Sequence, residues 1–573
     1  MRLYNFNIRK SLENLLLFIL IIPTIYFSFK ANYNALDSFS LFMDERISFE
    51  GIQKILNPKN ITDFFWSIYD GGDHRYGRIF WNSSALFISI PYYLFGENSQ
   101  VFLTRTFQVL LVTSSYLILC KSFIKNQFLR ILSLFFLLSI PYNSYYMTMP
   151  KPEPIQLFLF TLFLYFFHKK RFILNKSYWI ILGLSLGAKI SILPIAIVFF
   201  LYSTYIDLIK NDKNISIDNF LNTFFYISFG LSIAVPILLP HFVISLLLYI
   251  SLSSYFRIWY IKIFNVFIIL LINLILSLYL FSKDIILGLA MWGGSTLLNS
   301  AHGRDNIDVN FFDWINYIFF SWSDAPYLLI IITLILSILI LGRFINISFE
   351  RDNSQKFIPL LLIFSGIFSS LIIFLTVQRL WGFYIFINSI LIFLGILMII
   401  DFILGNTANQ KKSNKFLAYL TLFSLMACSL FWTKENINNF NKLSERTTSQ
   451  SYLLNYRSYK EIISFLDQYK SRSIKIMYDP SLFMITNTSN FSVDVFWGYL
   501  TDWDSSYDVI ILSSRHLPGG EIPDKNNVSY SDYITAINKY KNNVISHDEC
   551  VLNDTCYTEG LILSNDGVIL IKK

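Results

Sequence analysis

The chain has 573 residues, of which 54% are hydrophobic and only 15% are charged, and its mean hydropathy is +0.50. A soluble domain cannot hide that much apolar surface from water, so the composition excludes an ordinary soluble protein and indicates a membrane protein with several helices. The net charge of +8 does not indicate nucleic-acid binding, because the basic residues cluster in short loops between apolar segments, where they direct membrane topology.

The first apolar segment covers residues 13–30 and follows the basic sequence MRLYNFNIRK. It is too long for a signal peptide and lacks a small-residue cleavage site, so we expect a retained membrane helix with a cytoplasmic N-terminus. Lysine and arginine are enriched in the cytoplasmic loops of membrane proteins. Four basic loops are therefore predicted to be cytoplasmic: 121–130, 168–176, 208–214 and 409–415.

Residues 31–99 are predicted to form a long first loop on the external side. Within it, segment 79–96 is apolar but short and is aromatic near its end, so we expect it to lie along the membrane interface. Further spans are predicted at 100–120, 128–146, 153–167, 327–342, 357–377, 382–402 and 416–433, with a helix pair in 178–206. Residues 219–298 should add about three or four helices, which makes the predicted total about 11 to 14 at roughly 20 residues per span.

The chain becomes polar and mixed after residue 433, which predicts two domains: a polytopic α-helical membrane domain over 1–433 and a small soluble α/β domain over 434–573. Alternation of the spans from the cytoplasmic loops places this tail outside the cytoplasm. Helical periodicity predicts helices at 457–470 and 530–541, and short apolar runs predict strands at 473–478, 507–514 and 567–573.

Four cysteines are present. Cys550 and Cys556 lie close together in the polar tail, and an external location would favour a disulfide between them. A metal site is less favoured there, because His547 is the one histidine nearby. Cys120 and Cys428 lie in or beside apolar runs, and we expect them to be unreactive.

Five polar clusters are predicted near the external ends of spans. An ionisable group at such depth costs free energy unless it serves a purpose, so each cluster is a candidate functional site. The clusters are Asp44-Glu45-Arg46, YDGGDHRYGR at 69–78, MPKPEP at 149–154, AHGRDNID at 301–308 and QRLWGFY at 378–384.

The order of these features resembles that of the GT-C superfamily of membrane glycosyltransferases, most closely its protein O-mannosyltransferase and aminoarabinose-transferase branch. The residues that carry the resemblance are Asp44-Glu45, Tyr76-Gly77, Pro152-Glu153 and GLSLGAK at 183–189, together with the external tail. The resemblance implies a GT-C-like fold and inverting transfer of a monosaccharide from a polyprenyl-phosphate donor at the bacterial plasma membrane. The acceptor would be an extracytoplasmic protein, lipid or glycan. Arg46 departs from the branch, in which an aromatic residue often follows the acidic pair.

Such a reaction needs a base that removes the proton of the attacking hydroxyl group, and a positioned carboxylate can do so. The resemblance assigns this role to Asp44, with Glu45 orienting Asp44 or the acceptor, and the two carboxylates could exchange roles. Basic side chains would bind the phosphate of the leaving lipid. The candidates are Arg379 first, then Arg75, Arg78, Lys151 and Arg304. Supporting or substrate-binding candidates are Asp73, His74, Tyr76, Glu153, His302 and Trp381.

A monophosphate donor does not strictly require a metal ion, since arginine side chains can neutralise its charge. Four side chains could nevertheless hold a divalent ion: Asp44, Asp73, His74 and Glu153. Some of the candidates also have structural explanations, because Glu153 suits the first turn of a helix and Gly71-Gly72 is a strong turn signal. Lys189 is interpreted as a topogenic or snorkelling residue rather than a catalytic one.

Two other kinds of function fit a polytopic protein with external basic residues. A lipid-linked oligosaccharide polymerase, ligase or flippase would be expected to carry its key charges in a later external loop, not in the first. A non-enzymatic transporter would show broken helices or charges near mid-membrane in matching halves of the chain. The predicted charges gather at one face, which favours the glycosyltransferase hypothesis.

Overall fold

The computed structural model contains two compact units, which are described separately. The helical unit consists of Met1–Lys30, Glu50–Gly96 and Leu103–Asn441, and the mixed unit consists of Ala31–Phe49, Glu97–Phe102 and Lys442–Lys573. The structure describes residues 2–34, 43–69, 77–95, 99–170, 172–210, 217–239, 242–243, 246, 325–349, 357–377, 385–405, 412–445, 450–469, 471–478, 491–495, 507–512, 557–563 and 568–572.

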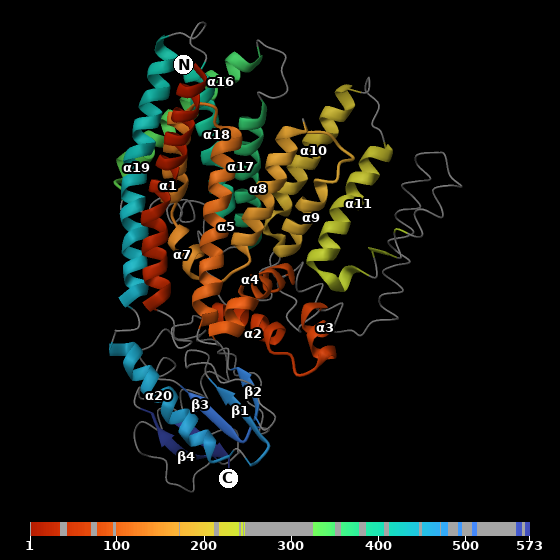
Figure 1. The fold of residues 1–573 in the computed structure, drawn as a ribbon, viewed down its shortest axis with the longest axis vertical. Coiled ribbons are helices and arrows are strands. Elements are labelled where there is room, and N and C mark those ends of the chain that lie inside the picture. The colour runs from red at the N-terminus through yellow and green to blue at the C-terminus, as the bar shows by residue number, and fades with distance from the viewer. Residues whose placement is uncertain are drawn as a thin grey trace, which may run out of the picture. The chain divides into compact units, whose positions relative to one another are not determined.

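Helices dominate the described part of the chain as far as Glu445 (Figure 1). In chain order, the described helices of this part are α1 (Arg2–Asn34), α2 (Met43–Leu56), α3 (Ile61–Tyr69), α4 (Ile79–Phe95), α5 (Ser99–Phe123), α6 (Gln127–Ser139), α7 (Asn143–Thr148), α8 (Glu153–Lys169), α9 (Trp179–Ala188), α10 (Leu193–Lys210), α11 (Ile217–Ala234), α16 (Tyr327–Phe349), α17 (Ile358–Val377), α18 (Phe386–Gly405) and α19 (Lys412–Glu445). Two short 3₁₀ helices, η2 (Ile190–Ile192) and η3 (Pro236–Leu238), follow α9 and α11.

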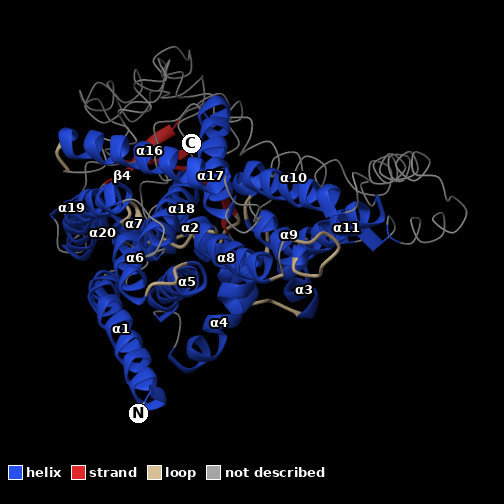
Figure 2. Ribbon diagram, turned by 90° about the horizontal axis from the view of Figure 1, so that it is seen from above, coloured by secondary structure: helices blue, strands red, loops and turns tan. Residues whose placement is uncertain are grey.

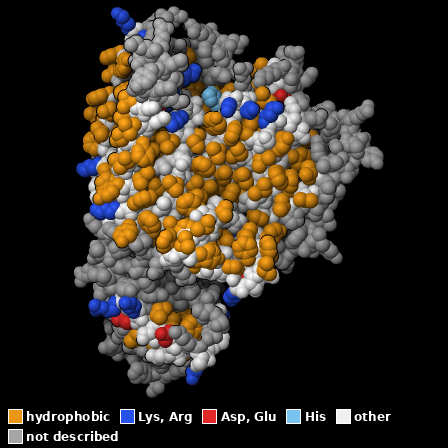
Figure 3. All heavy atoms as spheres, in the orientation of Figure 1, with side chains coloured by type: hydrophobic (Ala, Val, Ile, Leu, Met, Phe, Trp, Pro, Cys, Tyr) orange, Lys and Arg blue, Asp and Glu red, His pale blue; other side chains and the backbone are white. Residues whose placement is uncertain are grey.

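Seven of the described helices are long and apolar enough to cross a membrane: α1, α5, α10, α16, α17, α18 and α19. Outward-facing side chains on these helices include Ile338, Leu375 and Phe423, which are 67%, 66% and 73% exposed. Figure 3 shows hydrophobic side chains over most of the visible face of the helical unit. Because so large an apolar surface is unfavourable in water, the chain is a multi-pass membrane protein.

The predicted helices at 100–120, 153–167 and 357–377 are confirmed by α5, α8 and α17, and the predicted pair in 178–206 is confirmed by α9 and α10. Helix α19 extends to Glu445, beyond the end of its predicted span. The expected total of about 11 to 14 spans stays a prediction, because a large part of the chain between α11 and α16 lies outside the described residues.

The predicted span 128–146 is divided in the structure into α6 and α7. Tyr142 has a left-handed backbone conformation (φ 74°), and the proline before it has no N–H group to continue the helix. The carbonyl groups of residues 137–140 are satisfied instead by side-chain amides. Asn143 and Asn436 of α19 donate to these four oxygens at distances between 2.7 and 3.1 Å.

Contacts within the helical unit link helices in the order α16, α18, α17, α10, α9 and α11, and α8 also packs against α9 (Figures 1 and 2). Very close packing joins α9 to α11: a Cβ atom at Gly183 would overlap the carbonyl oxygen of Ile227, and one at Gly230 would overlap that of Ile180. Small residues let membrane helices approach in this way. The packing holds in place the end of α9, which carries part of the candidate site.

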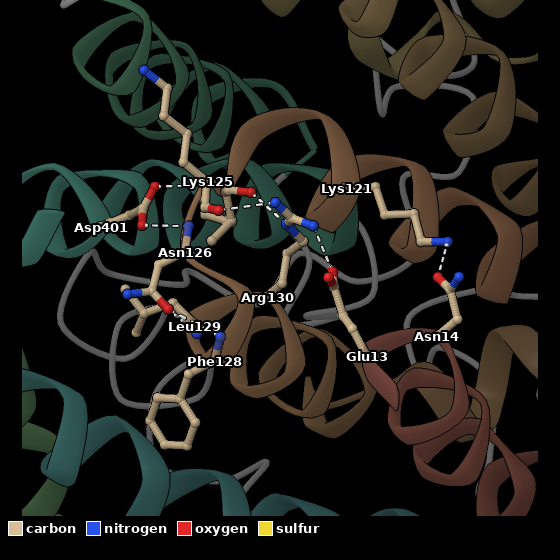
Figure 4. Close-up of polar contacts among 10 residues, drawn as sticks. Glu13, Asn14, Lys121, Lys125, Asn126, Phe128, Leu129, Arg130 and Asp401 are labelled. Atoms are coloured by element: carbon tan, nitrogen blue, oxygen red, sulfur yellow. Dashed lines mark hydrogen bonds and ion pairs between the residues drawn. The ribbon is translucent and has the colours of Figure 1, made fainter. Parts of the chain in front are cut away.

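A polar network joins α1, the α5–α6 connection and α18 (Figure 4). Glu13 of α1 accepts a hydrogen bond from Arg130 of α6 at 2.5 Å, and the Arg130 guanidinium also donates to two carbonyl oxygens of the connection. The Asp401 carboxylate of α18 accepts the backbone N–H groups of Lys125 at 2.8 Å and Asn126 at 3.0 Å. These contacts compensate the two buried carboxylates inside the protein, which indicates a structural role for the network.

The mixed unit contains α20 (Gln450–Asp467) and five described strands: β1 (Ile474–Tyr478), β2 (Phe491–Val495), β3 (Val509–Leu512), β4 (Tyr557–Ile562) and β5 (Val568–Lys572). The strand order is β2-β1-β3-β5-β4, in which β1 is parallel to β2 and β3, and β5 is antiparallel to β3 and β4. The core contains apolar side chains of α20 and the strands, among them Ile462, Phe465, Leu466, Ile476, Ile511 and Ile569.

The predicted helix 457–470 and the predicted strands 473–478, 507–514 and 567–573 are confirmed by α20, β1, β3 and β5. Strands β2 and β4 are not predicted from the sequence, because FSVDV and YTEGLI are short and mix polar with apolar residues. The predicted helix 530–541 and the cysteine pair Cys550–Cys556 lie outside the described residues. The division of the chain at residue 433 stays a prediction.

Candidate functional site

A buried ion pair joins the start of α8 to the end of α9. Lys189 Nζ lies 2.5 Å from Glu153 Oε1, and the two side chains are only 7% and 6% exposed. Proline at 152 and 154 favours the start of α8 at Glu153, where a carboxylate also suits the helix dipole. Helix α9 ends at Ala188, because Lys189 has an extended backbone (φ −158°, ψ 135°) that leads into η2. Burial of both charges is tolerated because they compensate each other.

Gln156, on the first turn of α8, ties this helix to the α9–η2 connection. Its side-chain nitrogen donates to the carbonyl oxygens of Ser185, at 3.2 Å, and Lys189, while its backbone carbonyl accepts the Ser185 hydroxyl group at 2.8 Å. Ser191 of η2 donates to the Gln156 side-chain oxygen at 3.2 Å. These bonds use both N–H groups of the Gln156 amide and fix the backbone that carries Lys189.

The ion pair lines a small pocket between α8, η2 and the start of α18, with room for about one group of the size of a water molecule. The lining residues are Glu153, Gln156, Lys189, Ser191, Ile192, Phe386, Ile387 and Asn388. Among the described atoms, Glu153 Oε2 is buried and has no hydrogen-bond partner. A buried carboxylate oxygen of this kind is rare in proteins, so it marks the pocket as a candidate binding site.

Gly77 brings the segment before α4 into contact with the end of α9. Its backbone N–H donates to the carbonyl oxygen of Ala188 at 3.4 Å, and a Cβ atom at this position would overlap the carbonyl oxygen of Gly187. Glycine is therefore needed for this close approach. Three of the four sequence features behind the GT-C resemblance, at Gly77, Glu153 and 183–189, meet in the structure although they lie far apart in sequence.

Arg78 and Lys151, two candidates for binding the lipid phosphate, are both buried in the helical unit. The Arg78 guanidinium donates to the carbonyl oxygen of Ser67 in α3 and lies over the Trp81 ring, 4.7 Å from its centroid. Lys151 Nζ lies 5.4 Å from the centroid of the Tyr145 ring. Both side chains thus make contacts that support packing, and their binding to phosphate stays a prediction.

Asp44 and Glu45 lie in the first turn of α2. Ten further candidates lie outside the described residues: Asp73, His74, Arg75, Tyr76, His302, Arg304, Arg379, Trp381, Cys550 and Cys556. Among the side chains that the structure describes, no three His, Cys, Asp or Glu residues come close enough to hold a metal ion. Of the four metal candidates, only the side chain of Glu153 is described, and it pairs with a lysine.

The expectation that Lys189 snorkels to the membrane surface is wrong, because its ammonium group is buried against Glu153. The sequence also did not indicate that Gln156, Ser191 and Asn388 belong to the site, since single polar residues in apolar helices form no distinctive pattern. A signal does exist for the ion pair. Glu153 and Lys189 have opposite charges, each beside an apolar stretch, and burial of one charge favours burial of a partner.

No family model and no curated protein matches the chain. Among solved structures, the chain is similar to the archaeal oligosaccharyltransferase AglB from Archaeoglobus fulgidus, solved in complex with an inhibitory peptide and a dolichol-phosphate. The sequence identity is 9% and the TM-score is 0.44, and the match covers 82% of the present chain and 62% of AglB. An identity and a TM-score this low assign no role to any residue.

Proposed function

We propose that the protein is an integral membrane glycosyltransferase of the GT-C type, which transfers a monosaccharide from a polyprenyl-phosphate donor to an extracytoplasmic acceptor. The observation that supports this proposal best is the convergence of Gly77, Glu153 and Lys189 beside one polar pocket. These residues belong to three separate sequence features of that superfamily. Ionisable groups buried among membrane helices are costly, so they usually serve a function.

The proposed reaction needs a base and a site for the departing phosphate. Asp44 would take the proton of the acceptor hydroxyl group as its oxygen attacks the anomeric carbon, with Glu45 orienting the base or the acceptor. The bond between the anomeric carbon and the phosphate oxygen then breaks, its electron pair stays on the phosphate, and the configuration inverts. Arg379 and the other basic candidates would stabilise the negative charge that develops on the leaving phosphate.

Transfer of radiolabelled sugar from polyprenyl-phosphate donors in membranes tests the proposal. Asp44→Asn should lower the transfer rate by roughly 10²- to 10⁴-fold, the usual contribution of a general base. Asp63→Asn is the matched control, because Asp63 is another carboxylate in the first turn of a helix of the same predicted loop. Equal rates in wild type and Asp44→Asn would exclude Asp44 as the base. No transfer by wild type from any donor would refute the proposed function.

A second candidate function is the movement of a lipid-linked saccharide across the membrane. Helix α9 has only 10 residues and ends at a buried charged pair, and broken helices with buried charges are typical of transporters. Vesicles containing the purified protein and a fluorescent polyprenyl-phosphate sugar distinguish the two functions. Faster exposure of the lipid to an external quencher, without sugar transfer, would favour the transporter over the glycosyltransferase.

A further inference from the structure

The polar groups of the pocket differ in the hydrogen bonds that they can still make. Several donors of the lining already have acceptors: the Gln156 amide donates to two carbonyl groups, the Ser191 hydroxyl donates to Gln156, and one N–H group of the Asn388 amide donates to Ser370 at 3.1 Å. Lys189 is committed to Glu153 Oε1, whereas Glu153 Oε2 is buried without a partner among the described atoms. Glu153 Oε2 can therefore accept a hydrogen bond from a group that enters the pocket.

The charge of the pocket restricts its ligand further. Its lining contains one carboxylate and one ammonium group, which cancel. A ligand that placed a carboxylate or phosphate in the pocket would bury a negative charge without a partner. Its oxygen atoms would also face Glu153 Oε2, so that hydrogen-bond acceptors would meet another acceptor. A neutral hydroxyl group instead donates to Glu153 Oε2 in a charge-assisted hydrogen bond.

The size and the apolar part of the lining indicate how much of a ligand enters. The pocket admits about one water-sized group, so a single hydroxyl group fits and a whole sugar ring does not. Ile192, Phe386 and Ile387 form the apolar part of the lining. Such side chains suit contact with the carbon skeleton next to a bound hydroxyl group, while a few polar atoms fix its orientation.

We propose that the pocket receives one hydroxyl group of the transferred sugar, with Glu153 Oε2 as the acceptor. It thereby selects a neutral sugar with a hydroxyl group at that position over a sugar with a carboxylate, a phosphate or no donor there. Lys189 is a positioning residue, because its ammonium group, 2.5 Å from Glu153 Oε1, orients the Glu153 carboxylate. This inference rests on the proposed function and specifies the class of sugar.

The experiment pairs changes in the sugar with changes in the pocket. Membranes with the full-length wild-type protein receive polyprenyl phosphates that carry glucose, mannose, galactose or arabinose. The sugar that is transferred is then supplied in single-deoxy forms, each of which lacks one hydroxyl group. One of these donors should lose roughly 10- to 100-fold in kcat/KM, the loss expected for one hydrogen bond to a charged acceptor.

The decisive comparison uses the double variant Glu153→Met/Lys189→Met, which removes the acceptor without leaving an unpaired charge. This variant should transfer the parent sugar and the critical deoxy sugar at equal rates. The loss in kcat/KM from the double variant and the loss from the missing hydroxyl group are then not additive. Glu13→Gln is the matched control, because Glu13 also forms a 2.5 Å ion pair and is buried, far along the chain from the pocket. It should keep the discrimination of wild type between the two donors.

Each outcome supports or overturns the inference. If the double variant transfers both donors more slowly but discriminates between them as wild type does, the pair has only a structural role and the inference is wrong, while the proposed function stands. Equal transfer of a neutral sugar and its uronic acid by wild type would overturn the predicted selection. If wild type transfers no sugar at all, the proposed function fails and the inference fails with it.

Discussion

Glu153 and Lys189 compensate each other's charge in a part of the helical unit that is shielded from solvent. Removal of one partner from a buried pair leaves an uncompensated charge, whereas replacement of both by apolar residues of similar size is often neutral. The Glu13–Arg130 pair has the same 2.5 Å separation, but its arginine is 22% exposed. Removal of one partner should therefore lower the free energy of unfolding by less at Glu13–Arg130 than at Glu153–Lys189.

Lys189→Met should destabilise the protein by about 3–5 kcal/mol, because it leaves the Glu153 carboxylate buried without its cation. The double variant Glu153→Met/Lys189→Met should recover most of this loss. Stability is compared as the temperature at which half of the detergent-solubilised protein is lost from its single peak in size-exclusion chromatography. A Lys189→Met protein as stable as wild type would show that the pair is not buried as described.

At the scale of helices, α9 and α11 approach so closely that backbone, and not a flexible side chain, would meet a Cβ atom at Gly183. Gly183→Ala should separate the two helices and destabilise the protein by roughly 1–3 kcal/mol, the usual cost of overpacking. Gly342→Ala in α16 is the control, since nothing lies within 4 Å of its Cβ position. That change should be neutral or slightly stabilising, because alanine favours the helix.

The predicted close packing of α9 against α11 would be wrong if Gly183→Ala and Gly342→Ala were equally stable in the same thermal assay. Equal stability would mean that α9 and α11 are further apart than the structure places them. A larger residue at Gly187 should behave like Gly183→Ala, because a Cβ atom there would already crowd Ala234 of α11. The effect would extend to Gly77, whose own Cβ position overlaps the Gly187 carbonyl oxygen.

Helices were predictable from sequence where a run of apolar residues is long and ends at a charge or a proline, as at α5, α8 and α17. The break between α6 and α7 was not predictable, because it depends on Asn436, which lies almost 300 positions away in the sequence. The Asn436 side chain accepts a backbone N–H group and donates to two backbone carbonyl groups that lose their helical partners at the break. Local sequence shows the proline but not the distant amide that makes a break tolerable in a membrane helix.

At the scale of the whole chain, the sequence order of Tyr76-Gly77, Pro152-Glu153 and GLSLGAK indicated related functional features but not their contacts. The contacts depend on tertiary packing: Gly77 on Gly187, and Glu153 on Lys189. Lys189 in particular was interpreted from its local surroundings as a topogenic or snorkelling residue. A lysine near an apolar run is consistent with either location, and only the position of an opposite charge distinguishes them.

Orientation in the membrane is the prediction on which the proposed reaction depends at this scale. Lys59, between α2 and α3, and Ser177, just before α9, are both exposed. Cysteines introduced at these positions can be labelled with a membrane-impermeant maleimide, since Cys120 and Cys428 are buried, in a background with Cys550→Ser and Cys556→Ser. Positive-inside counting predicts that Lys59→Cys is labelled in intact cells and that Ser177→Cys is labelled only after the membrane is disrupted. The reverse pattern would place the first loop, with Asp44, in the cytoplasm, and an extracytoplasmic acceptor could not reach it.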